Sequence, residues 1–286
     1  MIETRNLKFV YSENTPFEKQ ALKGIDIKIN DGEFIGIIGH TGSGKSTFIQ
    51  ILNGLVKPTC GKVLIDGVDI WKEPKKIRNI RFKVGLVFQY PEHQLFEETV
   101  YDDIAFGPKN MGLSKDEIEK RVLSAISFVN LRKDDIYKSP FDLSGGQKRR
   151  VAIAGVMAMM PKILILDEPT AGLDPLSRDN LIKRIKDYHK ESGATVLFVS
   201  HNMEDIAKIA DRVLVLNSGE VEMFDTSRNI FLKSERLEEI GLEVPAITRI
   251  IRKLKKKGYE LDDSVITVDE GLREILRLIN KEKKHD

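Results

Sequence analysis

The stretch Gly39-His40-Thr41-Gly42-Ser43-Gly44-Lys45-Ser46-Thr47 decides the fold class. It matches a phosphate-binding P-loop, and it lies between an apolar run at 34–38, which predicts a buried strand, and a predicted helix at about 45–54. Glycines let consecutive backbone N–H groups curl around phosphates, and the helix N-terminus adds a favourable dipole. We therefore expect all nine residues to bind a nucleotide, with Lys45 at the β- and γ-phosphates and the Ser46 hydroxyl on Mg²⁺. The alternative, a glycine-rich turn with a chance lysine, does not account for the flanking strand and helix.

A pair of acids follows a second apolar run. Residues 163–166 predict a buried strand, and Asp167 and Glu168 come directly after it. The carboxyl ends of strands are where a parallel sheet presents its ligand groups. Asp167 fits an anchor for Mg²⁺, through water, and Glu168 fits the base that polarises an attacking water. Taken alone, the pair could also be a solvated turn after a strand; the P-loop earlier in the chain favours the catalytic interpretation.

Strand and helix patterns alternate along most of the chain, which predicts an α/β fold with a mostly parallel sheet. Between about 91 and 161 the pattern is helical, so we expect a helical insert inside a P-loop core. The expected strands lie at 1–11, 22–30, 34–38, 83–89, 163–166, 195–199 and 213–216.

Composition excludes several classes of protein. The 286 residues include 46 Lys and Arg against 44 Asp and Glu, a net charge of +2, so a basic surface for nucleic acid is not indicated. A single cysteine, Cys60, excludes an internal disulfide and fits a reducing cytoplasm. No uncharged apolar stretch reaches the ~20 residues of a membrane-spanning helix. If the protein serves a membrane, we expect other chains to do the crossing.

A second anion-binding motif, Leu143-Ser144-Gly145-Gly146-Gln147, precedes a predicted helix at about 147–160. Ser144 occupies the capping position, and the glycines expose amide groups at the positive end of the helix. If the motif lies across the helical insert, on the far lobe, it cannot serve the phosphate held by the P-loop of its own chain. A head-to-tail dimer, in which each motif covers the other subunit's γ-phosphate, solves this. The open alternative is an ordinary helix cap.

Together these motifs resemble the ABC ATPase family over about residues 1–228. The resemblance implies an ABC cassette with a RecA-like mixed sheet core, an antiparallel β subdomain and a helical subdomain at about 91–161, and it implies ATP and Mg²⁺ as cofactors. It also implies roles for four further residues. Tyr11 matches the aromatic residue that stacks on adenine, and Gln89 matches the glutamine that contacts Mg²⁺ and the lytic water. Asp174 belongs to the loop that matches the one coupling the two sites of the dimer. His201 matches the switch histidine that contacts the γ-phosphate.

A narrower resemblance comes from residues 89–100 and 104–108, which look like the A-components of energy-coupling factor (ECF) transporters. The insertion at 14–18 is typical of the second of the two A-components. Members import vitamins or transition-metal ions, which implies a transmembrane T-component, a substrate-binding S-component and a second ABC ATPase chain as partners, and a peripheral location on the cytoplasmic face of the cell membrane. A heterodimer is favoured and a homodimer stays open; the substrate stays open too. Nucleic acid is not an expected partner. The competing hypotheses are a soluble ABC ATPase acting on nucleic acid or ribosomes, and a nucleotide-gated dimerisation module without turnover.

Residues 229–286 form an expected C-terminal extension with two amphipathic helical patterns. At least one apolar face should be buried, either on the extension's own core or on a partner. The resemblance favours a role in dimerisation, and self-packing is the alternative. The two faces are Ile247, Ile250, Ile251 and Leu254, and Leu272, Ile275, Leu276 and Ile279.

Overall fold

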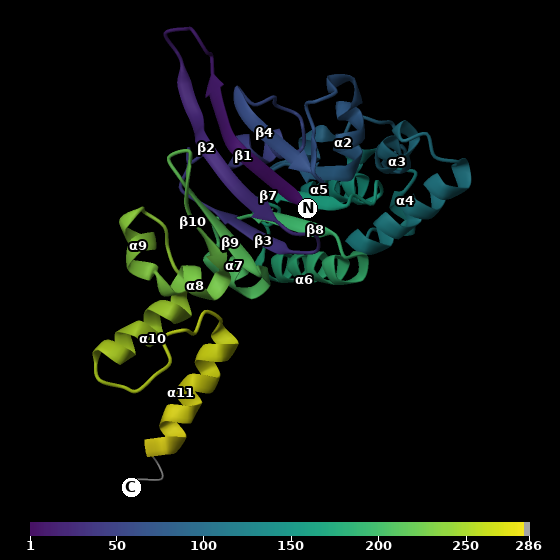
Figure 1. Cartoon of the computed structure of the whole chain (residues 1–286). Helices are drawn as coiled ribbons and strands as arrows, with labels where there is room; N and C mark the ends of the chain where they lie inside the picture. Colours follow the sequence, from purple (N-terminus) through teal and green to yellow (C-terminus); the bar gives the residue numbers. More distant parts are fainter. Residues whose placement is uncertain (283–286) are drawn as a thin grey trace.

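The computed structural model describes residues 1–282, and its centre is a six-stranded sheet in the order β10-β9-β3-β8-β7-β6 (Figure 1). Neighbouring strands are parallel except β10, which runs antiparallel to β9. Residues 283–286, the end of the predicted C-terminal extension, lie outside the described part. The strands are β3 (Phe34–Ile38), β6 (Val84–Val87), β7 (Ile163–Asp167), β8 (Thr195–Val199), β9 (Arg212–Asn217) and β10 (Glu220–Thr226).

A second, antiparallel sheet of four strands has the order β2-β1-β4-β5. The alternating residues Ile25, Ile27 and Ile29 of β2 are all buried, as the sequence pattern predicts. Helix α1 shares one hydrophobic core with both sheets, since Phe48 and Ile49 belong to the same cluster as the buried isoleucines. The elements are β1 (Ile2–Tyr11), β2 (Lys19–Ile29), β4 (Cys60–Ile65), β5 (Val68–Asp69) and α1 (Lys45–Leu52).

The other face of the large sheet packs against helices. Residues of β3, β7 and β8 share a second core with the helical segment between β6 and β7. Helix α4 begins at its cap Ser114 and ends at Asn130, whose left-handed backbone (φ 55°) stops the helix. This segment contains η2 (Pro91–Gln94), α3 (Val100–Asn110), α4 (Lys115–Val129), η3 (Lys133–Asp135), η4 (Pro140–Asp142) and α5 (Gly145–Met157); η1 (Pro74–Lys76), α2 (Ile77–Lys83), α6 (Pro175–Ser192) and α7 (Met203–Ile209) lie outside it.

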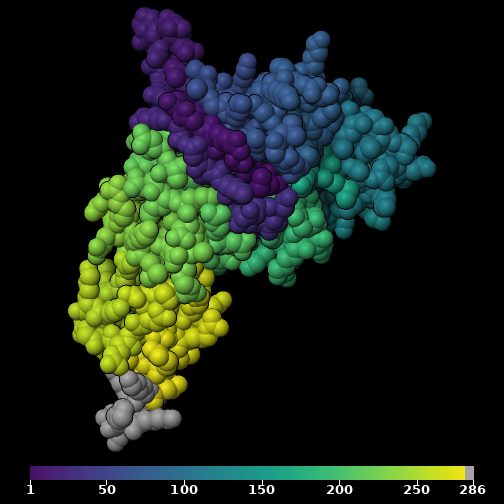
Figure 2. All heavy atoms as spheres, in the orientation of Figure 1, coloured from purple at the N-terminus to yellow at the C-terminus, as the bar shows by residue number. Residues whose placement is uncertain are grey.

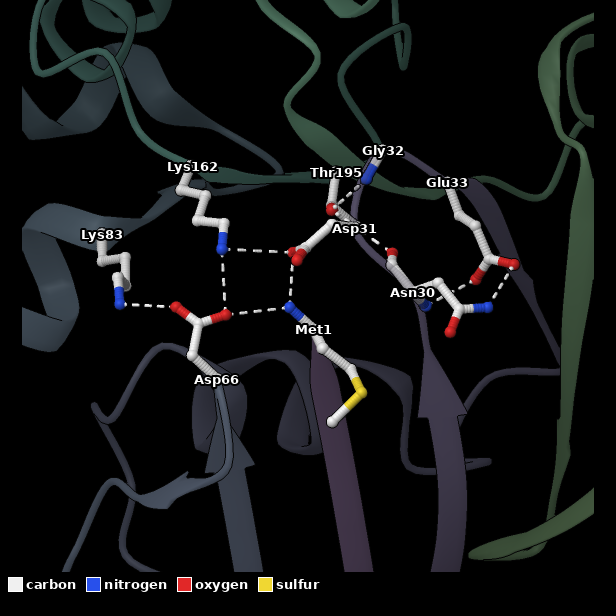
Figure 3. Close-up of polar contacts among 9 residues, drawn as sticks. All are labelled: Met1, Asn30, Asp31, Gly32, Glu33, Asp66, Lys83, Lys162 and Thr195. Carbon is white, nitrogen blue, oxygen red and sulfur yellow. Dashed lines mark hydrogen bonds and ion pairs between the residues drawn. The ribbon is translucent and has the colours of Figure 1, made fainter.

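A polar network fastens the two sheets together at the N-terminal edge of β6 and β7, the edge away from the predicted site (Figure 3). The Met1 amino group contacts Asp31 and Asp66, and Lys162 Nζ lies 2.9 Å from Asp66 and 3.3 Å from Asp31. Lys83 Nζ lies 2.7 Å from the other oxygen of Asp66. Lys83, then Lys162 and the amino group, hold the pKa of Asp66 far below its usual range.

Helices α10 and α11 form a separate lobe at one end of the molecule (Figures 1 and 2, yellow). Its small core comprises Ile247, Ile251, Leu261 and Val265, against which Leu254, Ile275 and Leu278 pack. The lobe therefore buries most of the first predicted face on itself. The lobe's helices are α10 (Ala246–Lys256) and α11 (Val268–Glu282). The preceding helices, α8 (Ser227–Leu232) and α9 (Ser234–Glu239), instead bury Ile230, Phe231 and Leu237 in the core that also contains the helical segment.

The second predicted apolar face divides in the structure. Ile275 packs inward, whereas Leu272, Leu276 and Ile279 are exposed on α11, together with Val268 at the start of the helix. The four exposed residues, in sequence order Val268, Leu272, Leu276 and Ile279, recur at positions i, i+4, i+8 and i+11, so they lie on one side of the helix. We call them the α11 stripe. No helix within residues 1–282 is both long and apolar enough to cross a membrane.

Candidate nucleotide site

A cleft of about 320 Å³ lies at the carboxyl ends of β3, β6, β7 and β8. Because these strands are parallel, the loops that follow them meet at this edge, and residues far apart in the sequence come together. Its lining residues are Tyr11, Lys19, Ala21, Thr41, Gly42, Gly44, Lys45, Ser46, Thr47, Gln89, Asp167, Glu168 and His201.

The P-loop wraps the start of α1. Gly44 needs to be glycine, because its φ is 102° and a Cβ would lie 2.8 Å from the Ala21 carbonyl oxygen. Lys45 is buried, and its Nζ donates to the carbonyl oxygens of Gly39 (2.6 Å) and His40 (3.1 Å). Burial lowers the pKa of Lys45, while Glu168 and then Asp167 oppose that shift. The ammonium thus lies between the loop and the two acids.

The remaining P-loop residues fix the loop to its surroundings. The Ser43 N–H donates to the His40 carbonyl (3.1 Å), and the Ser43 carbonyl accepts from the Gly219 N–H (3.0 Å). The Nε2 of His40 lies 3.1 Å from Asn217 Oδ1. The Tyr11 hydroxyl lies 2.9 Å from Thr47 Oγ1, so the tyrosine is held at the rim of the cleft.

An oxygen-rich corner suits Mg²⁺. The Ser46 hydroxyl donates to Asp167 Oδ2 at 3.4 Å, and Gln89 lines the same cleft. Burial raises the pKa of Asp167, and Ser46 and Lys45 oppose this. Mg²⁺ at phosphate sites takes one or two protein carboxylates with phosphate oxygens and water. One carboxylate, one hydroxyl and one amide therefore match its chemistry.

Glu168 has a constrained backbone and a buried carboxyl. Its φ is 49°, a left-handed value unusual for a side-chain-bearing residue. Its N–H donates to the Val199 carbonyl (3.1 Å), and its own carbonyl accepts from the Ala171 N–H (3.1 Å) and from Arg149 (3.0 Å). Burial raises the pKa of Glu168 to about 7, with a smaller contribution from Asp167, against the lowering effect of the His201 N–H.

The second anion-binding motif, residues 143–147, lies outside this cleft; we call it the signature. Ser144 caps α5, and its side chain and that of Gln147 form a reciprocal capping box. Ser144, Gly145 and Gly146 are exposed, and a Cβ added at Gly145 would meet no atom within 4 Å. Asp174 caps α6 by accepting from the Ser177 N–H (3.0 Å). The Ser177 side chain, and then this N–H, lower the pKa of Asp174.

Sequence reasoning did not single out Arg149 as a site residue. Its buried guanidinium donates to the main-chain carbonyls of two predicted site residues, Gln89 and Glu168, and to that of Ala171. No sequence pattern marks such a role, since a carbonyl acceptor carries no side-chain identity. A wider cleft of about 760 Å³, between α9 and α10, contains none of the predicted site residues, so volume alone does not locate the nucleotide site.

Comparison with known proteins assigns the family. A family model described as ABC transporter matches residues 22–171. The energy-coupling factor transporter ATP-binding protein EcfA2 of Caldanaerobacter subterraneus subsp. tengcongensis is 54% identical over 282 residues, 99% of each chain. The protein of the same name from Clostridium perfringens is also 54% identical, over 97% of this chain and 98% of that one. The chain belongs to the ABC transporter family, in its energy-coupling factor branch. It is therefore an ATPase subunit, as its motifs predict, and it is of the second A-component type.

Solved structures agree on the fold. The structure of cbiO1 from Clostridium perfringens, described as part of the ABC transporter complex cbiONQ, has a TM-score of 0.73 at 38% identity and covers 89% of this chain and 98% of its own. A dimeric post-hydrolysis state of the cassette MJ0796, bound to ADP and Pi, has a TM-score of 0.73 at 32% identity, with 79% and 99% covered. The predicted α/β ABC cassette is confirmed, and the alternative of a soluble ATPase acting on nucleic acid or ribosomes is not favoured.

Proposed function

We propose that this chain drives import of vitamins or transition-metal ions by closing around ATP with a second ABC ATPase chain, on the cytoplasmic face of the cell membrane. The observation that carries the proposal is the separation of the two anion-binding motifs. The P-loop lines the cleft, whereas Ser144, Gly145 and Gly146 lie exposed outside it. A second chain that presents its own signature would complete the site.

Within the cleft, each residue has a proposed part. Lys45 Nζ would exchange its two carbonyl partners for β- and γ-phosphate oxygens. Ser46, Gln89 and Asp167 would hold Mg²⁺, which would neutralise phosphate charge. Glu168 would accept a proton from the attacking water, and its Oε1 is buried without a hydrogen-bond partner, so it is free to do so. His201 would contact the γ-phosphate and Tyr11 the adenine.

The signature offers free main-chain N–H groups that could bind an anion. The first turn of a helix leaves N–H groups without intrahelical acceptors, and they attract negative charge. In α5 the capping box uses the N–H groups of Ser144 and Gln147, which leaves those of Gly145 and Gly146 for a ligand. A Cβ at Gly146 would meet only Arg150 Nη1, at 3.9 Å, so this chain's own packing does not require glycine there. Close approach of a γ-phosphate from the partner chain would account for it.

A groove in the helical segment would receive a helix of the transmembrane T-component. It measures about 240 Å³ and is lined on one side by Phe96 and Phe106, whose rings pack edge to face at 4.9 Å while remaining exposed. At its edge Asp103 Oδ2 is buried without a partner, and burial raises the pKa of this carboxyl. An apolar helix carrying one hydrogen-bond donor or cation would satisfy both features.

Cross-linking tests the groove. In a Cys60→Ser background, Phe96→Cys should form a disulfide with cysteines placed along the cytoplasmic helices of the T-component. Leu123→Cys is the control, because Leu123 is also an exposed apolar residue, on α4, and is not among the residues that line the groove. Cross-links from residue 123 but not from residue 96 would relocate the docking site.

The α11 stripe would keep the two ATPase chains together when no nucleotide is bound. The inward face of α11 already covers the lobe's core, so the outward residues Val268, Leu272, Leu276 and Ile279 are left over from self-packing. A partner chain would cover them. Since this chain is of one A-component type, we propose a heterodimer with the other type, and selectivity for the imported compound in a separate S-component.

Co-purification tests the function. The full chain, captured from native membranes, should bring with it a second ABC ATPase chain and integral membrane chains. Its ATP turnover per chain should be higher in that complex than alone. Recovery of the chain without membrane proteins, at an ATP turnover equal to that of the complex, would reject the transport role.

A further inference from the structure

Arg149 connects two separate loops of the site to one helix. It lies one turn into α5, the helix that begins at the signature cap Ser144, and its side chain is 6% exposed. Its Nη1 donates to the Ala171 carbonyl at 2.5 Å, and its Nη2 donates to the carbonyls of Gln89 at 3.1 Å and Glu168 at 3.0 Å. A planar guanidinium offers five donors in a fixed fork, which a lysine or glutamine cannot reproduce.

We infer that Arg149 is a positioning residue for ATP hydrolysis, one that makes the signature helix, the Gln89 loop and the loop from Glu168 to Asp174 move as a unit. The inference rests on the proposed roles of Glu168 and Gln89. Arg149 itself lies outside the nucleotide cleft and would act through these residues.

The backbone of Glu168 shows why such a support is needed. A residue with a side chain in the left-handed region costs roughly 1–2 kcal/mol relative to the right-handed one. Here the Glu168 carbonyl accepts two hydrogen bonds, from Ala171 N–H and from Arg149, and Arg149 also binds the Ala171 carbonyl. The arginine therefore holds both ends of this short turn. Without it, the Glu168 carbonyl would be held by the Ala171 N–H alone, and the only other main-chain hydrogen bond of Glu168 would be that of its N–H to the Val199 carbonyl.

The third contact reaches toward the membrane partner. Gln89 lies two residues before η2, so its carbonyl is at the start of the segment that contains the groove lined by Phe96. That segment is the one proposed to receive the T-component. A shift of that segment would reach Arg149 through one hydrogen bond and Glu168 through a second. Burial lowers the pKa of Arg149, yet a guanidinium stays charged, so its buried donors require these acceptors.

The test compares Arg149→Gln and Arg149→Lys with Arg184→Gln in the full complex. Arg184 is a matched control: it too donates to main-chain carbonyls, those of Phe128 (2.6 Å) and Ser127 (3.5 Å), but far from the cleft. For each variant, kcat, KM, ATP affinity and melting temperature are measured, with and without the membrane partner. Hydrogen exchange of residues 89–90 and 168–172 is followed in parallel.

We expect Arg149→Gln to lower kcat on the order of 10- to 100-fold, the effect of a misplaced catalytic group. ATP affinity should stay within about twofold, because the P-loop is untouched. Stimulation by the membrane partner should disappear, and exchange should speed up in both loops. Arg149→Lys keeps the charge but loses the fork, so its kcat should fall between those of Arg149→Gln and the unchanged chain.

Two outcomes would overturn the inference. Unchanged kcat and partner stimulation in Arg149→Gln would remove any positioning role. Equal losses of kcat, ATP affinity and melting temperature, matched by Arg184→Gln, would mean that the arginine only supports folding. A Glu168→Gln variant run alongside separates this test from the proposed function. If Glu168→Gln retains turnover, the proposed base is wrong; if it loses turnover while Arg149→Gln keeps it, the base assignment stands and only the positioning role fails.

Discussion

The Nε2 atom of His201 lies 3.4 Å from Oε1 of Glu168, and both side chains line the cleft that contains the P-loop. Burial, and then Lys45, lower the pKa of His201, which favours a neutral imidazole near pH 7. The Glu168 oxygen is buried and without a hydrogen-bond partner. The pair thus presents an acceptor and a ring nitrogen side by side, where a water and a γ-phosphate would meet.

Glu168→Gln should retain ATP binding and lose hydrolysis. The substitution preserves shape but removes the base, and a positioned acid–base group contributes on the order of 10²–10⁴-fold to a rate. Nucleotide titration and steady-state phosphate release measure the two properties separately. Near-normal turnover in this variant would reject Glu168 as the base.

Lys45→Ala should weaken ATP binding itself. The buried Lys45 ammonium donates a hydrogen bond to the P-loop carbonyl of Gly39. Its loss removes a positive charge from the proposed phosphate site. ATP affinity is measured by titration, with Lys62→Ala, an exposed lysine of β4, as the control. Equal ATP affinity in both variants would contradict the assignment of Lys45.

Ser144→Arg should block ATP-dependent dimer closure while leaving ATP binding to the single chain intact. A bulky cation at the exposed cap would stand where the partner's γ-phosphate approaches. The test is size-exclusion chromatography with ATP in a Glu168→Gln background, with the second ATPase chain present. Ser144→Ala, which loses the cap at a cost of about 1 kcal/mol but adds no bulk, is the control. An ATP-dependent dimer of the Ser144→Arg variant would refute action across the interface.

Truncation after Phe231, which removes α9 to α11, should weaken association with the partner ATPase in the absence of nucleotide and spare ATP binding. A sharper version is Leu276→Glu on the α11 stripe, since this exposed side chain is not needed for the lobe's own core. Arg277→Gln changes the net charge by the same one unit at an exposed position of α11 on another side of the helix, and it should have no effect. If the truncated chain still co-purifies fully with the partner ATPase in the absence of ATP, the extension does not contribute to dimerisation and only packs on its own chain.

Asp66→Asn should lower stability at neutral pH and lose that effect in acid. Contacts with Lys83, Lys162 and the amino terminus depress the folded-state pKa of Asp66 (Figure 3). A depressed carboxyl pKa stabilises the fold above the unfolded-state value, about 3.9, and that contribution is lost as pH falls through the folded value. The melting-temperature difference from the unchanged chain should hold from pH 7 to 5 and shrink below about pH 4. Asp187→Asn, exposed on α6, is the control, and a difference that grows in acid would contradict the network.

The sequence predicted the parts of the molecule whose signals are local. The P-loop, the acids at the carboxyl end of β7 and the cap Ser144 each depend on neighbouring residues. The structure places the P-loop between β3 and α1, Asp167 as the last residue of β7, and Ser144 at the start of α5. Strands β4, β5 and β10 were not predicted. In the case of β4, the strand begins with Cys60 and Gly61, and it is held by its pairing with β1. The division of α11 into two faces, and the contacts of Arg149, likewise depend on tertiary neighbours that periodicity does not reveal.

ATP turnover per chain, measured while the chain is diluted and then while the second ATPase chain and the membrane partner are added back, tests the central claim most directly. If each site needs the signature of another chain, turnover per chain should fall on dilution and rise as the partner chains saturate it. A rate per chain that stays constant through both titrations would contradict a shared site.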